Sequence, residues 1–165
     1  MTMLRPDRVR LYTVLLLLAA LHFYLRPRLG YPKVAPDFLL LALLIFCIRS
    51  RPGDAAMAGF AVGLVGDSLT PASFGAGAMA HTLVAYLAAW GRAVFFADNL
   101  LVNAGFFAVG LWLRNVIVLL ASGPVGTGLP MVLGVWSVLQ ALTTAVAGAL
   151  ILVIFRRWLS IRLAE

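Results

Sequence analysis

Apolar runs follow one another along most of this chain, from residue 11 to residue 155, with only short polar breaks between them. A single solvated core would leave charged faces and polar linkers between such runs. The pattern therefore predicts an all-α integral membrane protein, a bundle of six transmembrane helices that forms one polytopic domain. The predicted spans cover residues 11–25, 37–48, 54–69, 76–90, 99–121 and 130–155.

Prolines, a glycine and an aspartate mark the expected ends of these helices. Pro36 precedes the second segment and Pro52 the third, which suits the first turn of a helix. We expect Gly91 to end the fourth helix and Asp98 to cap the fifth. The first two segments are short for a bilayer, which takes roughly 20 residues to cross. We expect them to extend into their flanks, to let arginines snorkel to the surface or to thin the lipid locally.

Composition supports the membrane assignment. The chain is 63% hydrophobic and 12% charged, whereas soluble domains carry about 25% charged residues. Its net charge of +7 resides in the breaks between apolar runs and not on one solvated face. This distribution is typical of a bilayer surface and disfavours nucleic acid as a partner.

The distribution of Lys and Arg predicts the orientation, because cytoplasmic loops collect these residues. With the N-terminus inside, nine basic residues lie on the cytoplasmic side and three outside, so both termini should be cytoplasmic. Arg26, Pro27 and Arg28 follow the first segment where a signal peptide would have a small-residue cleavage site, so we expect it to be a retained anchor. The inside set is Arg5, Arg8, Arg10, Arg49, Arg51, Arg92, Arg156, Arg157 and Arg162; the outside set is Arg26, Arg28 and Lys33.

Three glycines in the third segment predict a helix-packing face. Gly59, Gly63 and Gly66 are spaced by four and three residues, which places them on one stripe of a helix, with Phe60 beside them. Small residues let another backbone approach closely in lipid. We expect this face to receive a partner's helix, so that a large residue at Gly63 would weaken partner binding and leave insertion intact.

Four polar residues are expected to gather in the outer half of the bundle, namely Asp37, Asp67, His81 and Arg114, with His22 at a similar depth. Carboxylates in spanning helices usually face the protein interior or water. We hypothesise that Arg114 pairs with Asp67 or Asp37 and fixes the register of the bundle. Helix capping, headgroup contact or snorkelling to the surface would explain the same residues without a pair.

Further polar side chains in the last two segments are expected to make interhelical hydrogen bonds: Asn103, Gln140, Thr143 and Thr144. The sequence contains no nucleophile motif and no cluster with metal-ligand spacing, and Cys47 is its only cysteine. Asp37 and Asp67 are the one candidate pair for an intramembrane aspartyl enzyme. We therefore expect neither catalysis nor a metal or other cofactor.

Two stretches resemble a known family, PDFLLLALL from Pro36 and GFAVGLVGDSLTPASFGAGAMAHTLVAYL from Gly59. They are similar to the rod shape-determining protein MreD family over about a third of the chain. Residues 70–74, expected to form an outer turn, differ in sequence from the family pattern. The family motif falls on Pro36, Asp37, Gly59, Phe60, Gly63, Asp67, Leu69, Gly75, Tyr86 and Leu87.

The resemblance implies a multi-pass protein of the bacterial inner membrane that acts as a non-catalytic scaffold of the elongasome and supports peptidoglycan synthesis and rod shape. It implies MreC as the direct partner. RodA, a class B penicillin-binding transpeptidase and MreB would be reached through the complex.

The family also resembles, in architecture, the substrate-binding subunits of energy-coupling-factor transporters. The alternative function is therefore a vitamin-like small-molecule binder that uses an outer cavity near Asp67, His81 and Arg114. Those subunits carry an alanine packing motif in the first span, where this chain offers only the adjacent Ala19 and Ala20.

Overall fold

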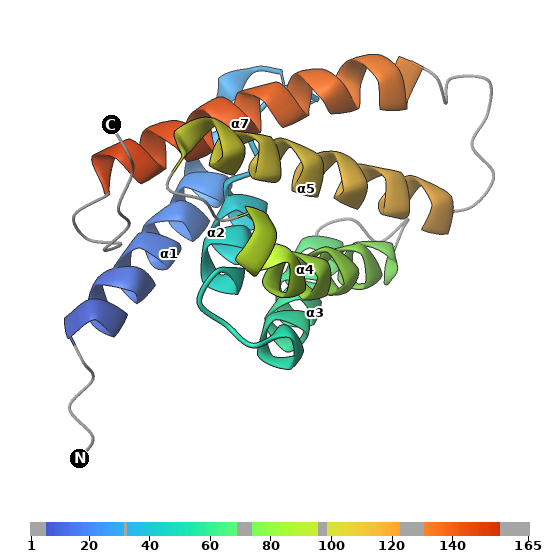
Figure 1. Ribbon diagram of the computed structural model, residues 1–165. Helices are drawn as coiled ribbons and strands as arrows, with labels where there is room; N and C mark the ends of the chain where they lie inside the picture. Colours follow the sequence, from blue (N-terminus) through green and yellow to red (C-terminus); the bar gives the residue numbers. More distant parts are fainter. Residues whose placement is uncertain (1–5, 32, 69–73, 96–98, 123–130, 156–165) are drawn as a thin grey trace.

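The computed structural model describes residues 6–31, 33–68, 74–95, 99–122 and 131–155, and within these ranges it is all-helical, as predicted (Figure 1). Six α-helices are accompanied by one short 3-10 helix and one π-helical turn. In chain order these are α1 Pro6–Tyr24, the 3-10 helix Arg26–Leu29, α2 Phe38–Cys47, α3 Pro52–Ser68, α4 Ala76–Phe95, α5 Leu100–Ala121, the π turn Val132–Trp136 and α7 Ser137–Ile154.

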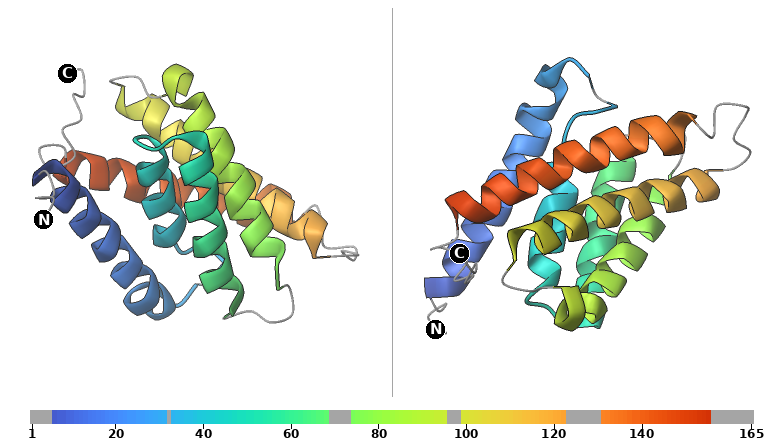
Figure 2. Two further views of the ribbon diagram at one scale, coloured as in Figure 1. Left: turned by 90° about the horizontal axis from the view of Figure 1, so that it is seen from below. Right: turned by 45° about the horizontal axis from the view of Figure 1, so that its top comes forward.

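The helices pack as two hairpins and a crossing pair. Helices α3 and α4 lie side by side, and α1 lies against α2 (Figure 2). Helices α5 and α7 run alongside each other and cross the other four (Figures 1 and 2).

Helix α2 forms the centre of the bundle. It contacts α1, α3, α4, α5 and α7, and all of its residues except Leu39 and Phe46 are buried. Ten residues span about 15 Å, roughly half of a bilayer's hydrocarbon core. The expected extension into the flanks does not occur for α2, whereas α1 does extend, to Pro6. Protein surrounds α2 on all sides, so its short length creates no mismatch with lipid.

Several helix ends differ from the predicted ones. Helix α1 begins at Pro6 rather than Leu11, and α4 continues through Gly91 to Phe95. A glycine inside a helix costs only about 1 kcal/mol, so Gly91 does not end it. Asn99 caps α5, its Oδ1 accepting from the N–H of Leu101 at 2.8 Å. Asp98, the expected cap, lies outside the described residues.

Among the described residues, two helical stretches are long and apolar enough to cross a membrane. They cover Leu100–Ala121 and Val132–Ile154. The second includes the π turn, which ends at Trp136. The Lys33 ammonium lies 5.3 Å from the centre of the Trp136 ring.

The distribution of polar and apolar side chains supports a lipid environment. Large apolar residues are exposed on several helices, among them Leu16, Trp90, Leu101 and Leu120. Ionisable and amide side chains are buried instead, including Asp37, Asp67, His81, Asn103 and Gln140. Polar residues inside and large apolar residues outside are the arrangement expected when the surrounding solvent is hydrocarbon.

Two of the predicted stripe glycines pack α3 against α4. A Cβ atom on Gly59 would collide with the carbonyl oxygen of His81, and one on Gly63 would collide with the backbone of Ala78. Gly66 has open space around its Cβ position, and the Phe60 side chain is 51% exposed. The contact surface of Gly59 and Gly63 is thus filled by this chain's own α4.

We expect Gly63→Leu to destabilise the fold itself, unlike the expectation from sequence that insertion would remain intact. The side chain would meet the α4 backbone, which cannot move aside as a flexible side chain could, so the loss should be about 3 kcal/mol, at the upper end of the usual cost of overpacking. The measurement is the free energy of unfolding in mixed detergent micelles, followed by circular dichroism.

Gly53→Leu is the matched control, since Gly53 lies in the first turn of α3 with nothing within 4 Å of its Cβ position. It should change stability by less than about 0.5 kcal/mol. Equal stability of the two variants would contradict the packing role of Gly63.

Candidate functional site

A cavity of about 260 Å³ collects most of the ionisable side chains of the bundle interior. All four residues of the predicted outer cluster line it: Asp37 directly precedes α2, and the others come from α3, α4 and α5. We refer to it as the polar cavity. Its lining is His22, Arg26, Asp37, Leu39, Gly66, Asp67, Gly77, His81, Arg114 and Val118.

Asp67 caps the start of α4 from the end of α3. Its Oδ2 accepts from the N–H of Gly75 at 2.8 Å and of Ala78 at 2.9 Å, and its Oδ1 accepts from Gly77 at 3.0 Å. The first N–H groups of a helix have no partner within the helix, and lipid offers none. The carboxylate supplies the acceptors, which explains why it is only 4% exposed.

The turn between α3 and α4 is shaped to let Asp67 reach these groups. Gly75 has φ +95°, in the left-handed region that favours glycine. A Cβ atom on Gly77 would collide with the Asp67 carboxylate. Glycine at both positions therefore permits the capping geometry.

Asp37 caps the start of α2. Its Oδ1 accepts from the N–H of Leu40 at 3.0 Å, and its own N–H donates to Thr144 Oγ1 at 3.1 Å. His22 Nδ1 lies 3.3 Å from the same Oδ1. Asp37 thus connects α2 to α1 and to α7.

The two histidines bond mainly to neighbouring backbone and to Arg26. His81 is 3% exposed, and its Nδ1 donates to the carbonyl of Gly77 at 2.8 Å. His22 Nδ1 is 3.2 Å from the N–H of Leu39, and its Nε2 is 3.4 Å from Arg26 Nη1. Both rings contribute polar walls to the cavity.

Arg114 forms no ion pair with Asp37 or Asp67, all three being described residues. Its Nη1 donates to Asn115 Oδ1 at 2.9 Å. Asn115 Nδ2 in turn donates to Ser137 Oγ at 3.0 Å and to Gln140 Oε1 at 3.1 Å. Arg114 is thereby connected to α7 through hydrogen bonds of Asn115, and it is not bonded to a carboxylate.

The polar residues predicted on α7 do bond across the bundle. Gln140 Nε2 donates to the carbonyl of Ala35 at 3.3 Å, and Thr143 Oγ1 donates to that of Val34 at 2.6 Å. Together with the Thr144 contact to Asp37, they anchor the segment that leads into α2. Asn103 is fully buried on α5.

Sequence reasoning missed several residues of the site. Arg26 was assigned to an outer loop, and Asn115, Ser137 and Gly77 were not singled out. Of the family-motif positions, Leu69 lies outside the described residues, while Tyr86 and Leu87 are partly exposed on α4. Within the described ranges, no group of three or more His, Cys, Asp or Glu side chains could hold a metal ion.

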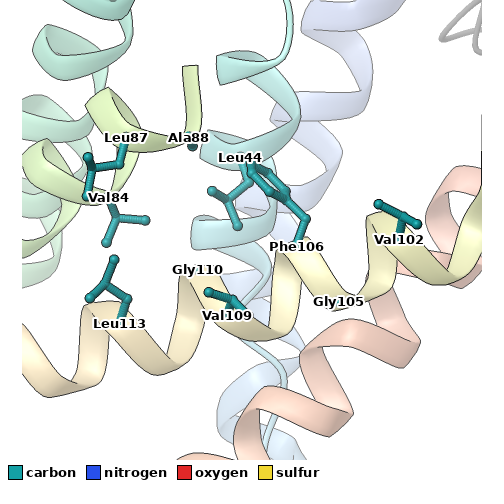
Figure 3. Close-up of a pocket in the computed structure, with 10 residues that line it drawn as sticks. All are labelled: Leu44, Val84, Leu87, Ala88, Val102, Gly105, Phe106, Val109, Gly110 and Leu113. Atoms are coloured by element: carbon teal, nitrogen blue, oxygen red, sulfur yellow. The ribbon is translucent and has the colours of Figure 1, made fainter. Parts of the chain in front are cut away.

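A second, apolar groove of about 320 Å³ lies between α2, α4 and α5 (Figure 3). Gly105 has open space at its Cβ position, and a Cβ on Gly110 would sit 3.0 Å from Leu44 Cδ1. The groove is lined by Leu44, Val84, Leu87, Ala88, Val102, Gly105, Phe106, Val109, Gly110 and Leu113.

We expect Asp67→Ala to lower the free energy of unfolding by at least about 2 kcal/mol, because the buried N–H groups of Gly77 and Ala78 and the part-buried one of Gly75 would lose their acceptor. Asp67→Asn should cost less, since its amide retains one acceptor oxygen. Denaturant titration of the purified protein in detergent is the measurement. Asp54→Ala, an exposed aspartate in the first turn of α3, is the control and should cost under about 1 kcal/mol. A similar cost for both alanine variants would argue against the cap.

Comparison with known proteins identifies the family of the chain. A family model described as rod shape-determining protein MreD matches residues 8–162. No curated protein and no solved structure matches the chain. Because the match covers nearly all of the 165 residues, the resemblance of the two shorter motifs extends over the whole bundle, and this chain belongs to the rod shape-determining MreD family, whose role is in cell shape.

Proposed function

We propose that this chain is a non-catalytic scaffold subunit of the bacterial elongasome, which binds MreC and so supports peptidoglycan synthesis and rod shape. Family membership over residues 8–162 is the observation that carries the proposal. RodA, a class B penicillin-binding transpeptidase and MreB are reached through the complex. The exposed apolar side chains on every long helix suit a subunit that meets its partners within the membrane.

The hydrogen bonds of the Asp37 and Asp67 carboxylates favour a scaffold over an enzyme. An aspartyl enzyme needs two carboxylates that share one water. Here Asp67 accepts hydrogen bonds from three backbone N–H groups. Asp37 accepts one such bond and also contacts His22. Both side chains are engaged in holding helix starts, which is a structural task.

We further propose that all six helices lie in the inner membrane, with both termini cytoplasmic and the polar cavity in the outer half. Arg10, Arg49 and Arg51 then lie on the cytoplasmic side. Arg26 and Lys33, which precede α2, lie outside. The enclosed position of α2 lets it avoid the length that a lipid-facing span requires.

The apolar groove is the proposed docking site for the transmembrane helix of MreC. Gly59 and Gly63, the face first expected to receive it, are already packed against α4. Gly105 and Gly110 instead leave the groove shallow along α5, with aliphatic side chains on either side (Figure 3). A groove with a small-residue floor lets a helix ridge approach closely, which is what drives association in lipid.

A vitamin-like ligand, as in the transporter subunits of similar architecture, is the less favoured function. Pockets for molecules of that size span about 300–1,000 Å³ and are mostly apolar. The polar cavity holds about 260 Å³ and is lined by four charged residues and two histidines. Its size and lining suit a smaller, charged group.

Gly105→Leu should fill the groove and weaken capture of MreC at least tenfold, while the bundle stays folded because nothing lies within 4 Å of the Cβ position. Capture is measured in native membranes with a photo-crosslinking residue at Val109, and the captured chain is identified as MreC by mass spectrometry.

Gly134→Leu is the matched control, since Gly134 is exposed with equally open space outside the groove. A crosslinker at Leu16 on α1, which is exposed, serves as the control position. Undiminished capture by Gly105→Leu, or equal capture from Leu16, would rule out the groove as the interface.

The proposed topology predicts which thiols can be labelled from outside. In a Cys47→Ser background, Tyr31→Cys should react with a membrane-impermeant maleimide in intact spheroplasts, because Tyr31 is exposed in the outer segment. Arg51→Cys, exposed between α2 and α3, should react only after the membrane is permeabilised. The opposite labelling pattern would reverse the orientation.

A further inference from the structure

We propose that the polar cavity binds a phosphate group, held between the guanidinium groups of Arg26 and Arg114. The inference rests on the hydrogen bonding and charge of the cavity walls, and it is independent of the proposed docking of MreC.

Both arginines have donors that the protein does not use. Arg114 Nη1 donates to Asn115 and Arg26 Nη1 contacts His22, but the buried Nε of each side chain has no acceptor in the described part of the chain. A buried donor on a charged group is costly when unpaired. Because Nε–H and Nη–H lie along one edge of the guanidinium as a fork, each arginine presents a site that matches an oxyanion.

The carboxylates of the cavity bond to other groups and make no ion pair with either arginine in the described part of the chain. Asp67 accepts from the N–H groups of Gly75, Gly77 and Ala78, and Asp37 Oδ1 accepts from Leu40 and contacts His22. Each carboxylate also sits at a helix N-terminus, which contributes roughly +0.5 of a charge. With two arginines, two capped carboxylates and two helix starts, the cavity carries about one net positive charge and favours an anion.

The position of Arg114 is fixed before any ligand arrives. Asn115 accepts from it and donates to Ser137 and Gln140 on α7. Asn115 is therefore a positioning residue for the anion site. A guanidinium that is already oriented loses little side-chain freedom on binding, which strengthens the interaction.

The dimensions of the cavity select a compact ligand. About 260 Å³ accommodates a phosphate with a small attached group but not a drug-sized molecule. Two arginines that line one cavity suit the several oxygens and high charge of phosphate. The phosphate could be free in solution or belong to a lipid headgroup, and the experiment separates these sources.

The test uses the full chain purified in a maltoside detergent, with thermal unfolding as the readout. Inorganic phosphate is titrated against sodium chloride at matched ionic strength. In a second arm the chain is placed in nanodiscs of phosphatidylglycerol or of a phosphate-free glycolipid, and retained lipid is identified by native mass spectrometry. The variants are Arg114→Gln, Arg26→Gln and Arg114→Lys, with Arg28→Gln as the control because Arg28 is exposed and does not line the cavity.

If the ligand is free phosphate, inorganic phosphate stabilises the wild type and Arg28→Gln. The half-saturating phosphate concentration rises at least tenfold in Arg114→Gln and Arg26→Gln. It rises as much in Arg114→Lys, because lysine keeps the charge but lacks the two-pronged guanidinium. For a lipid headgroup, only phosphatidylglycerol stabilises and is retained, with the same dependence on the variants. The proposal is overturned if neither source stabilises the protein, or if stabilisation survives loss of Arg26 or Arg114. Should Arg114→Gln fail to fold without ligand, Arg26→Gln alone decides.

Discussion

The structure depends on one requirement of buried helix starts, that every free backbone N–H there must find an acceptor inside the protein. Asp67 does this for α4 and Asp37 for α2. Both carboxylates sit where two helices meet, so satisfying the N–H groups also fixes how the helices are placed. The polar cavity follows from this requirement, since the capping groups bring charge to one place in the bundle.

The order and type of the helices could be predicted from apolar runs and break residues, because lipid-facing helices need continuous apolar sequence. Their lengths could not. Gly91 looks like a helix end in sequence, yet α4 passes through it, and the ten residues of α2 are too few for a lipid-facing span. Whether a helix faces lipid or protein depends on the neighbours that surround it, and a local pattern does not contain them.

The candidate site was partly visible in the sequence. Asp37, Asp67, His81 and Arg114 stand out as ionisable residues in apolar segments, and they do line one cavity. Their pairing was not predictable, since Arg114 bonds to its neighbour Asn115 and the carboxylates bond to backbone. Likewise, the spacing of Gly59 and Gly63 predicts that another helix backbone approaches closely, but it does not say which helix. In the structure that helix is α4 of the same chain.

The hydrogen bond between Asp37 and Thr144 joins residues that are 107 positions apart in the chain. Thr143 and Gln140 add further bonds to the segment just before α2. The central helix is thus fixed by groups on α7, which is synthesised long after α2. During synthesis α2 lacks these partners, so its native surroundings form only after α7 has been made.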